Sequence, residues 1–233
     1  MNKLNANARV TELDGLSDTI VRLYKDDSAA AKDAFVAATM ADVERLSAEI
    51  TTAILQDKAL STLEAADSER DKAIVALGKA LEGYAALPIP AKQAAAEPLL
   101  AAYEKYSKAG ITRASYISES SMTESLLEDL AKESFSGNIS ALDGVAEAIA
   151  AIRAAQDAFT AANDSYIAAN ESKGASATSL KKPLLAAINE KLVPYLTAMQ
   201  IANNAECASF TAAVEAEIKR LNEAIAKRSK KDE

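Results

Sequence analysis

Residues 60–84, LSTLEAADSERDKAIVALGKALEGY, decide the fold class of this chain. Side chains spaced three or four residues apart form a stripe in which two charged residues interrupt an apolar series: Leu60, Leu63, Asp67, Arg70, Ile74, Leu77, Leu81 and Tyr84. This spacing places all of them on one face of an α-helix, and the stretch lacks the period-two alternation of a strand. It therefore predicts a long amphipathic helix that packs against other helices.

The rest of the chain repeats this pattern between turn residues. We expect helices over about 11–25, 28–57, 60–86, 91–109, 112–133, 141–172, 178–200 and 204–229, interrupted at sites such as Pro88-Ile89-Pro90, Gly110 and Ser136-Gly137-Asn138. The 53 alanines among 233 residues let helices approach closely along narrow, coiled-coil-like seams. No segment has a strand pattern. The sequence predicts an all-α antiparallel helical bundle of about seven to eight helices, built as one bundle or as two four-helix units.

The expected domain organisation is sequential. Residues 1–10 are expected to form a flexible N-terminus, 11–135 a first helical unit, 138–229 a second unit packed on the first, and 230–233 a tail. Short internal repeats leave a tandem duplication open. The segments 33–38 and 157–162 match at an offset of 124 residues, but 98–102 and 183–187 match at 85, and one duplication does not explain both.

Composition excludes several classes of protein. The chain has 26 basic and 34 acidic residues, a net charge of −8, no histidine and a single cysteine. Ser-His-Asp and Cys-His catalysts and histidine-ligated metal sites are therefore excluded, and we expect no cofactor and no metal. The acidic balance argues against nucleic acid as a partner. With no long apolar run and no signal-like N-terminus, no membrane span and a cytoplasmic location are expected, and export stays open if a leader was removed.

The stripe of the predicted helix 141–172 also contains polar residues. Gln156, Asn163 and Tyr166 follow one another at helical spacing, just as Asp67 and Arg70 do in 60–84. We call these five residues the polar seam. Polar groups on a packing face are destabilising unless they are paired or hydrated. The seam is therefore a paired layer that fixes helix register, a stretch that faces solvent at that level, or the lining of a pocket for a small ligand or ion.

Other candidate residues have simpler interpretations. The carboxylates Glu119, Glu124, Glu128 and Asp129 cluster at helical spacing and are expected on solvated faces. Cys207 lies on the apolar stripe of the last helix, where a buried thiol is expected because no histidine is present to activate it.

A family resemblance agrees with the helical pattern. The run Asp67-Ser-Glu-Arg70-Asp71-Lys-Ala-Ile74, followed by 98–106, Gly110, 124–130 and 217–225, resembles a family of helical proteins from Bacteroidetes that is a domain of unknown function. The similarity covers about residues 10–228. It implies a helical fold in a bacterial protein and assigns no active-site residue.

These observations favour a non-enzymatic interaction or structural protein that binds a protein partner or associates with itself. The first alternative is a bundle that binds a small molecule or ion in the polar seam. An enzyme that uses carboxylates, tyrosine or lysine as acid and base is less favoured, and a surface adhesin would require export.

Overall fold

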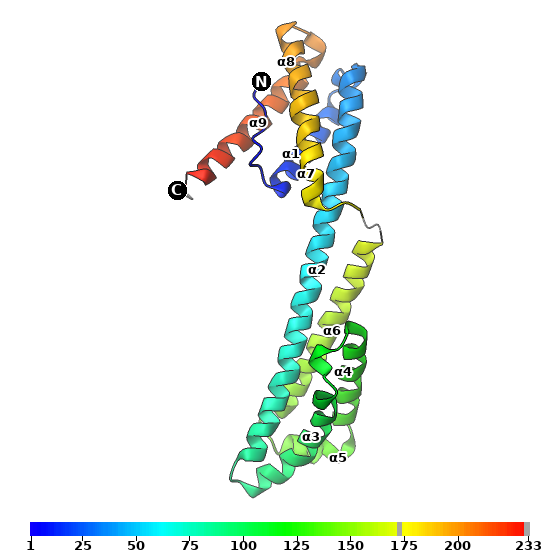
Figure 1. Cartoon of the computed structure of the whole chain (residues 1–233), viewed down its shortest axis with the longest axis vertical. Coiled ribbons are helices and arrows are strands. Elements are labelled where there is room, and N and C mark those ends of the chain that lie inside the picture. Colours follow the sequence, from blue (N-terminus) through cyan, green and yellow to red (C-terminus); the bar gives the residue numbers. More distant parts are fainter. Residues whose placement is uncertain (172–173, 231–233) are drawn as a thin grey trace. The chain divides into compact units, whose positions relative to one another are not determined.

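The computed structural model of the chain describes residues 1–171 and 174–230. Its α-helices are α1 (Val10–Asp26), α2 (Ala34–Ala86), α3 (Pro90–Lys108), α4 (Tyr116–Leu130), α5 (Glu133–Ser140), α6 (Val145–Asn170), α7 (Ala177–Ala186), α8 (Val193–Ile201) and α9 (Ala208–Ser229) (Figure 1). A π-helical turn, Ala187–Leu192, joins α7 to α8 in one continuous helix just before Pro194. The described residues thus form eight helical rods without a strand, and the prediction of an all-α helical bundle is confirmed.

The chain divides into two compact units that are not sequential. Unit 1 comprises Met1–Asp57 and Ala169–Glu233, and unit 2 comprises Lys58–Ala168. This division differs from the expected units 11–135 and 138–229. Helix α2 continues through residues 57–60, where neither proline nor glycine interrupts it, and Gly137 lies inside α5 and not in a linker.

In unit 1, helices α1, α7, α8 and α9 and the first part of α2 enclose an apolar core. Helix α2 begins several residues later than expected because Asp33 supplies its N-cap, accepting hydrogen bonds from the backbone N–H groups of Phe35 and Val36. The Tyr195 hydroxyl donates to the other oxygen of Asp33 over 2.6 Å, and this bond raises the pKa of Tyr195 to about 12. Cys207 is buried in the same core, as predicted.

The first residues of the chain are fixed by side-chain amides. The Leu4 N–H donates to Asn189 Oδ1 over 2.8 Å, and Asn189 Nδ2 donates to the Leu4 carbonyl over 2.8 Å. Asn222 makes the same pair of bonds to the N–H of Asn5 and the carbonyl of Lys3. Because Leu4 and Ala8 are also buried, the expectation of a flexible segment 1–10 is wrong. Of the expected tail 230–233, only Lys230 lies within the described residues.

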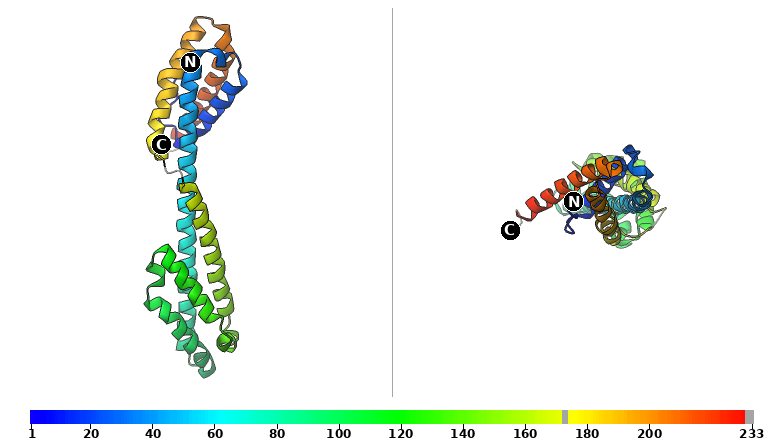
Figure 2. Two further views of the ribbon diagram at one scale, coloured as in Figure 1. Left: turned by 90° about the vertical axis from the view of Figure 1, so that its right-hand side faces the viewer. Right: turned by 90° about the horizontal axis from the view of Figure 1, so that it is seen from above.

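In unit 2, α6 runs beside α2, and α3, α4 and α5 cover part of their length (Figures 1 and 2). Large apolar side chains from α2, α3, α4 and α6 form its main core, which includes Ile74, Leu81, Leu99, Leu126 and Ile152. A smaller cluster of Leu63, Phe159 and Ala162 continues the apolar contacts between α2 and α6.

Helix α3 approaches α2 closely at a glycine. A Cβ atom built on Gly78 would lie 2.4 Å from the Tyr103 ring, which is itself buried. We expect Gly78→Ala to destabilise the chain, because overpacking costs about 1–3 kcal/mol and exceeds the roughly 1 kcal/mol that alanine gains in helix propensity. The matched control is Gly83→Ala on the same helix, where a Cβ meets nothing within 4 Å and a small stabilisation is expected. Urea unfolding of both variants measures the difference, and equal stabilisation by both would contradict the close contact.

Candidate functional site

Arg70 is the centre of the most unusual group of polar side chains in unit 2. Its side chain is 0% exposed, although arginine is rarely buried without partners. Nη2 donates to Asp67 Oδ1 over 2.7 Å, and Nη1 donates to Gln156 Oε1 over 3.0 Å and to Ser120 Oγ over 2.9 Å. Nε lies 3.0 Å from Glu119 Oε1. The guanidinium therefore contacts side chains of three helices: α2, α4 and α6.

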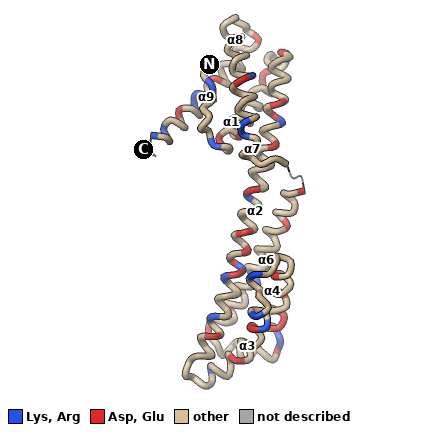
Figure 3. Tube along the Cα trace, in the orientation of Figure 1, with Lys and Arg blue, Asp and Glu red and all other residues tan. Residues whose placement is uncertain are grey.

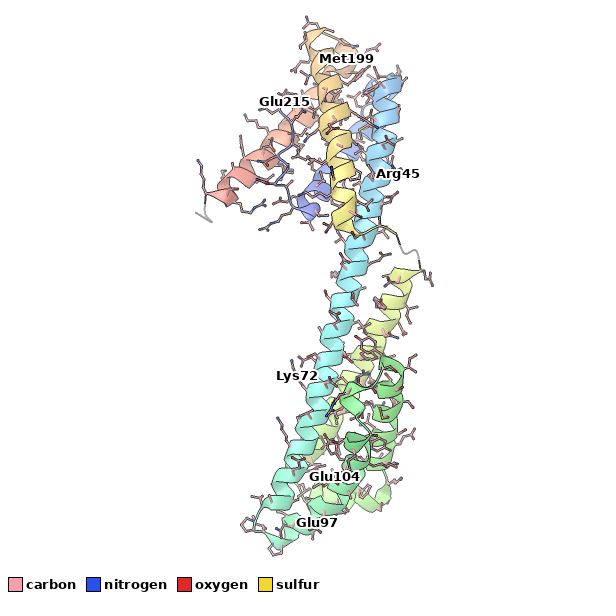
Figure 4. All side chains as sticks on the ribbon, in the orientation of Figure 1. Arg45, Lys72, Glu97, Glu104, Met199 and Glu215 are labelled. Atoms are coloured by element: carbon pink, nitrogen blue, oxygen red, sulfur yellow. The ribbon has the colours of Figure 1, made fainter. Side chains whose placement is uncertain are left out.

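The helical register explains why Arg70 points inward. It lies seven residues after Leu63 and four before Ile74, both of which are buried on the same stripe of α2. Lys72, only two residues away, is exposed, pairs with Glu69 and points away from the other helices of unit 2 (Figure 4). The two cations of one short segment thus have opposite environments because two residues correspond to about half a helical turn.

Two aromatic rings complete the surroundings of Arg70. Its guanidinium carbon lies 3.6 Å from the centroid of the Phe159 ring, at the distance of a cation–π contact. The Tyr116 ring packs edge-on against Phe159 with the centroids 5.3 Å apart. The guanidinium plane, which is poorly hydrated, is therefore covered by an aromatic face while its edge is paired with oxygens.

Glu119 is the most strongly perturbed carboxyl of this cluster. It is only 2% exposed, and desolvation by burial raises its pKa to about 7 against the opposing attraction of Arg70. Burial also raises the pKa of Asp71, which interacts with Glu119 and with the nearby Asp67. Both carboxyls therefore keep their protons to a higher pH than an exposed carboxyl does.

The chemistry available to this cluster is limited by its burial. A carboxyl with a pKa near 7 suits acid–base catalysis, but Glu119 and Arg70 are closed off from solvent. The hydroxyl of Thr123, one turn after Glu119, is also buried and has no hydrogen-bond partner among the described residues. The arrangement resembles a paired polar layer between helices more than the lining of a ligand pocket.

The structure brings together three of the five polar-seam residues. Asp67, Arg70 and Gln156 are joined by hydrogen bonds. Asn163 and Tyr166 lie farther along α6, where Tyr166 packs against the Leu63–Phe159–Ala162 cluster.

Sequence reasoning missed Glu119, which was expected on a solvated face. The signal was present, because Glu119 heads a buried 3-4 stripe that continues through Thr123, Leu126 and Leu130 of α4. The carboxylates Glu124 and Asp129 of the same helix are more exposed than Glu119, as the sequence analysis expects. Glu124 binds the exposed Arg153, and Asp129 binds Lys105, Lys132 and the Tyr106 hydroxyl, which together hold the pKa of Asp129 well below its usual value.

Residues 1–171 and 174–230 contain no group of three or more acidic or cysteine side chains placed to hold a metal ion. Within the same ranges, every helix is too short or too polar to cross a membrane.

Comparison with protein families identifies the chain at the level of a family. A model described as "Family of unknown function (DUF6261)" matches residues 60–222. The chain belongs to this family. Searches of curated proteins and of solved structures find no significant match. The DUF6261 match covers Asp67, Arg70, Glu119 and Gln156 and agrees with the expected kinship to helical proteins of unknown function. The bacterial group suggested by the resemblance stays a prediction.

Proposed function

We propose that this DUF6261 chain is a non-enzymatic helical protein that acts by binding another protein. The observation that carries the proposal is the exposure of large apolar side chains in unit 2. Ile117 is 85% exposed and Ile167 is 55% exposed, although both residues belong to well-formed helices. Large apolar side chains exposed to water gain free energy when a partner protein covers them, which favours an interface at these positions.

The contacts of Arg70 support the same proposal. The alternative of a small ligand in the polar seam needs free polar groups around a cavity. Arg70 instead uses Nη1 and Nη2 on Asp67, Gln156 and Ser120 and lies against Phe159. Its Nε is ion-paired with Glu119 without an aligned hydrogen bond. A rigid, paired layer of this kind suits a scaffold that presents its outer faces.

The proposal is tested by comparing the wild-type chain with the double variant Ile117→Ser/Ile167→Ser. We expect light scattering after size exclusion, across a wide range of concentrations, to reveal self-association, or quantitative affinity capture to identify a protein that only the wild type retains. The control is Ser165→Ala, an exposed position on α6. A wild type that stays monomeric and captures the same proteins as the double variant would contradict the proposal.

A further inference from the structure

The backbone around Leu4 is hydrogen-bonded on both edges, although it lies outside the helices (Figure 1). On one edge, the N–H and the carbonyl of Leu4 bond to the side-chain amide of Asn189, each over 2.8 Å. On the other edge, the side-chain amide of Asn222 bonds to the N–H of Asn5 over 2.8 Å and to the carbonyl of Lys3 over 2.9 Å. This alternation of sides is the hydrogen-bonding pattern of an extended strand. The two asparagines thus take the places that neighbouring strands have in a sheet.

Two cations bind the carbonyl groups that follow. Lys181 Nζ donates to the Ala6 carbonyl, and Arg228 Nη2 donates to the Asn7 carbonyl, both over 3.1 Å. Like the two asparagines, these cations bind backbone atoms of the segment. We call residues 3–8 the strap, and we call the four side chains that bind its backbone the strap site: Lys181, Asn189, Asn222 and Arg228.

The strap buries two of its side chains, those of Leu4 and Ala8. Leu4 belongs to the apolar core of unit 1, whereas residues 5–7 are exposed. Hydrogen bonds to a backbone give affinity for any extended peptide, and the pockets that take side chains give sequence preference. An occupant of the strap site therefore needs a leucine and, four residues later, a side chain as small as alanine.

The position of Asn189 is an independent sign of a binding site. This residue lies in the π-helical turn Ala187–Leu192 that joins α7 to α8. Such turns are rare and frequently occur at functional sites. Here the turn carries the asparagine that binds both backbone polar groups of Leu4.

Net charge has little part in this recognition. Basic and acidic residues are interspersed along α9 (Figure 3), and Arg228 is also paired with Glu12 of α1. Lys181 donates to a carbonyl group, which every peptide offers. The strap site therefore selects an occupant by its extended backbone and its apolar residue.

We propose that the strap site is a peptide-binding site that the strap occupies as an internal ligand, and that an extended segment of another protein with a leucine followed four residues later by an alanine replaces it. The seated strap defines this chemistry, because its backbone and its two buried side chains make the contacts that the partner repeats. A non-helical segment with so few buried side chains is of the kind that opens locally while the rest of a unit stays folded. The site involves neither Ile117 nor Ile167, so this inference is independent of the proposed function.

The test uses the full chain with Leu4→Asp and a labelled, acetylated peptide with the sequence of residues 2–9. An aspartate is costly to bury in the apolar core, so the strap detaches and leaves the strap site free. Fluorescence anisotropy is expected to detect peptide binding to Leu4→Asp. The wild type should bind roughly tenfold more weakly or less, because its own strap competes at a high effective concentration. Circular dichroism verifies the fold, and Leu4→Ala, which weakens the apolar contact without adding charge, provides a second variant.

The contribution of Asn189 is tested by adding Asn189→Ala to Leu4→Asp. Two hydrogen bonds to the peptide are lost, and we expect binding to weaken about tenfold. The matched control is Glu190→Ala in the same background, at the adjacent, exposed position of the π-helical turn. This control should bind the peptide as tightly as Leu4→Asp alone.

Four outcomes would overturn the inference. Failure of the peptide to bind folded Leu4→Asp would show that the strap site holds no separate peptide, and equal binding by the wild type would show that the strap does not compete for it. Equal effects of Asn189→Ala and Glu190→Ala would remove the argument from the amide. A dimer of the wild type that Leu4→Asp dissociates would show that two copies exchange their straps, so that the strap is not an internal ligand.

Discussion

Replacing Arg70 by leucine is expected to lower the stability of the chain by about 3–5 kcal/mol, because removal of one partner from a buried ion pair strands the other. Glu119 and Gln156 are buried, and both lose their contact with the guanidinium. For a chain of this size the loss corresponds to a decrease of about 10 °C in the melting temperature. Thermal unfolding followed by circular dichroism measures it.

The control for this experiment is Arg153→Leu. Arg153 also binds a carboxylate, that of Glu124, but both side chains are about half exposed, and such surface pairs contribute little. We expect a change of less than about 1 kcal/mol for this variant. If Arg70→Leu were as mild as Arg153→Leu, the guanidinium would not be a buried structural element, and the interpretation of the polar seam as a paired layer would fail.

The second large effect concerns Glu119→Gln and depends on pH. Burial raises the pKa of Glu119 to about 7 in the folded chain, whereas an unburied glutamate has a pKa of 4.5. Between these values the unfolded chain loses its proton while the folded chain keeps it, so the folded state becomes less stable as the pH rises. The shift corresponds to a loss of about 3 kcal/mol that is complete above pH 7 and absent below pH 4.5.

A glutamine mimics the protonated carboxyl and removes this pH dependence. We therefore expect Glu119→Gln to match the wild type near pH 4.5 and to have a free energy of unfolding about 3 kcal/mol above that of the wild type at pH 8. Urea unfolding of both proteins across this range gives the difference directly. Glu124→Gln, at an exposed carboxylate, should follow the wild type at every pH. A difference between Glu119→Gln and the wild type that does not change with pH would show that Glu119 titrates normally.

The sequence was sufficient to predict the helices and the inward direction of Arg70. Helical spacing alone identifies the stripe from Leu60 to Tyr84, and it correctly places a charged pair on a packing face. The positions of Gln156 and Cys207 follow in the same way, because each lies on the apolar stripe of its own helix.

The remaining features depend on contacts between distant residues. The environment of Glu119 is set by Arg70 and Asp71 on another helix, and periodicity within α4 does not reveal which stripe is buried against which partner. The sequence analysis predicts separate helices over 28–57 and 60–86, whereas α2 is continuous through residues 57–60. Asn189 and Asn222 hold the first residues from the opposite end of the chain, a contact that local patterns do not encode.

Unit 1 is built from two chain segments separated by the whole of unit 2, and this separation affects the order in which the units can fold. Unit 2 is a single stretch, Lys58–Ala168, and every contact inside it is available as soon as that stretch has left the ribosome. Unit 1 must wait for α7, α8 and α9, which are synthesised last, and its two segments meet where Gln56 Nε2 donates to the Ala169 carbonyl. A folded unit 2 already connects these segments through α2 and α6, which lowers the entropy lost when they join. We therefore expect unit 1 to form with a smaller loss of chain entropy once unit 2 has folded.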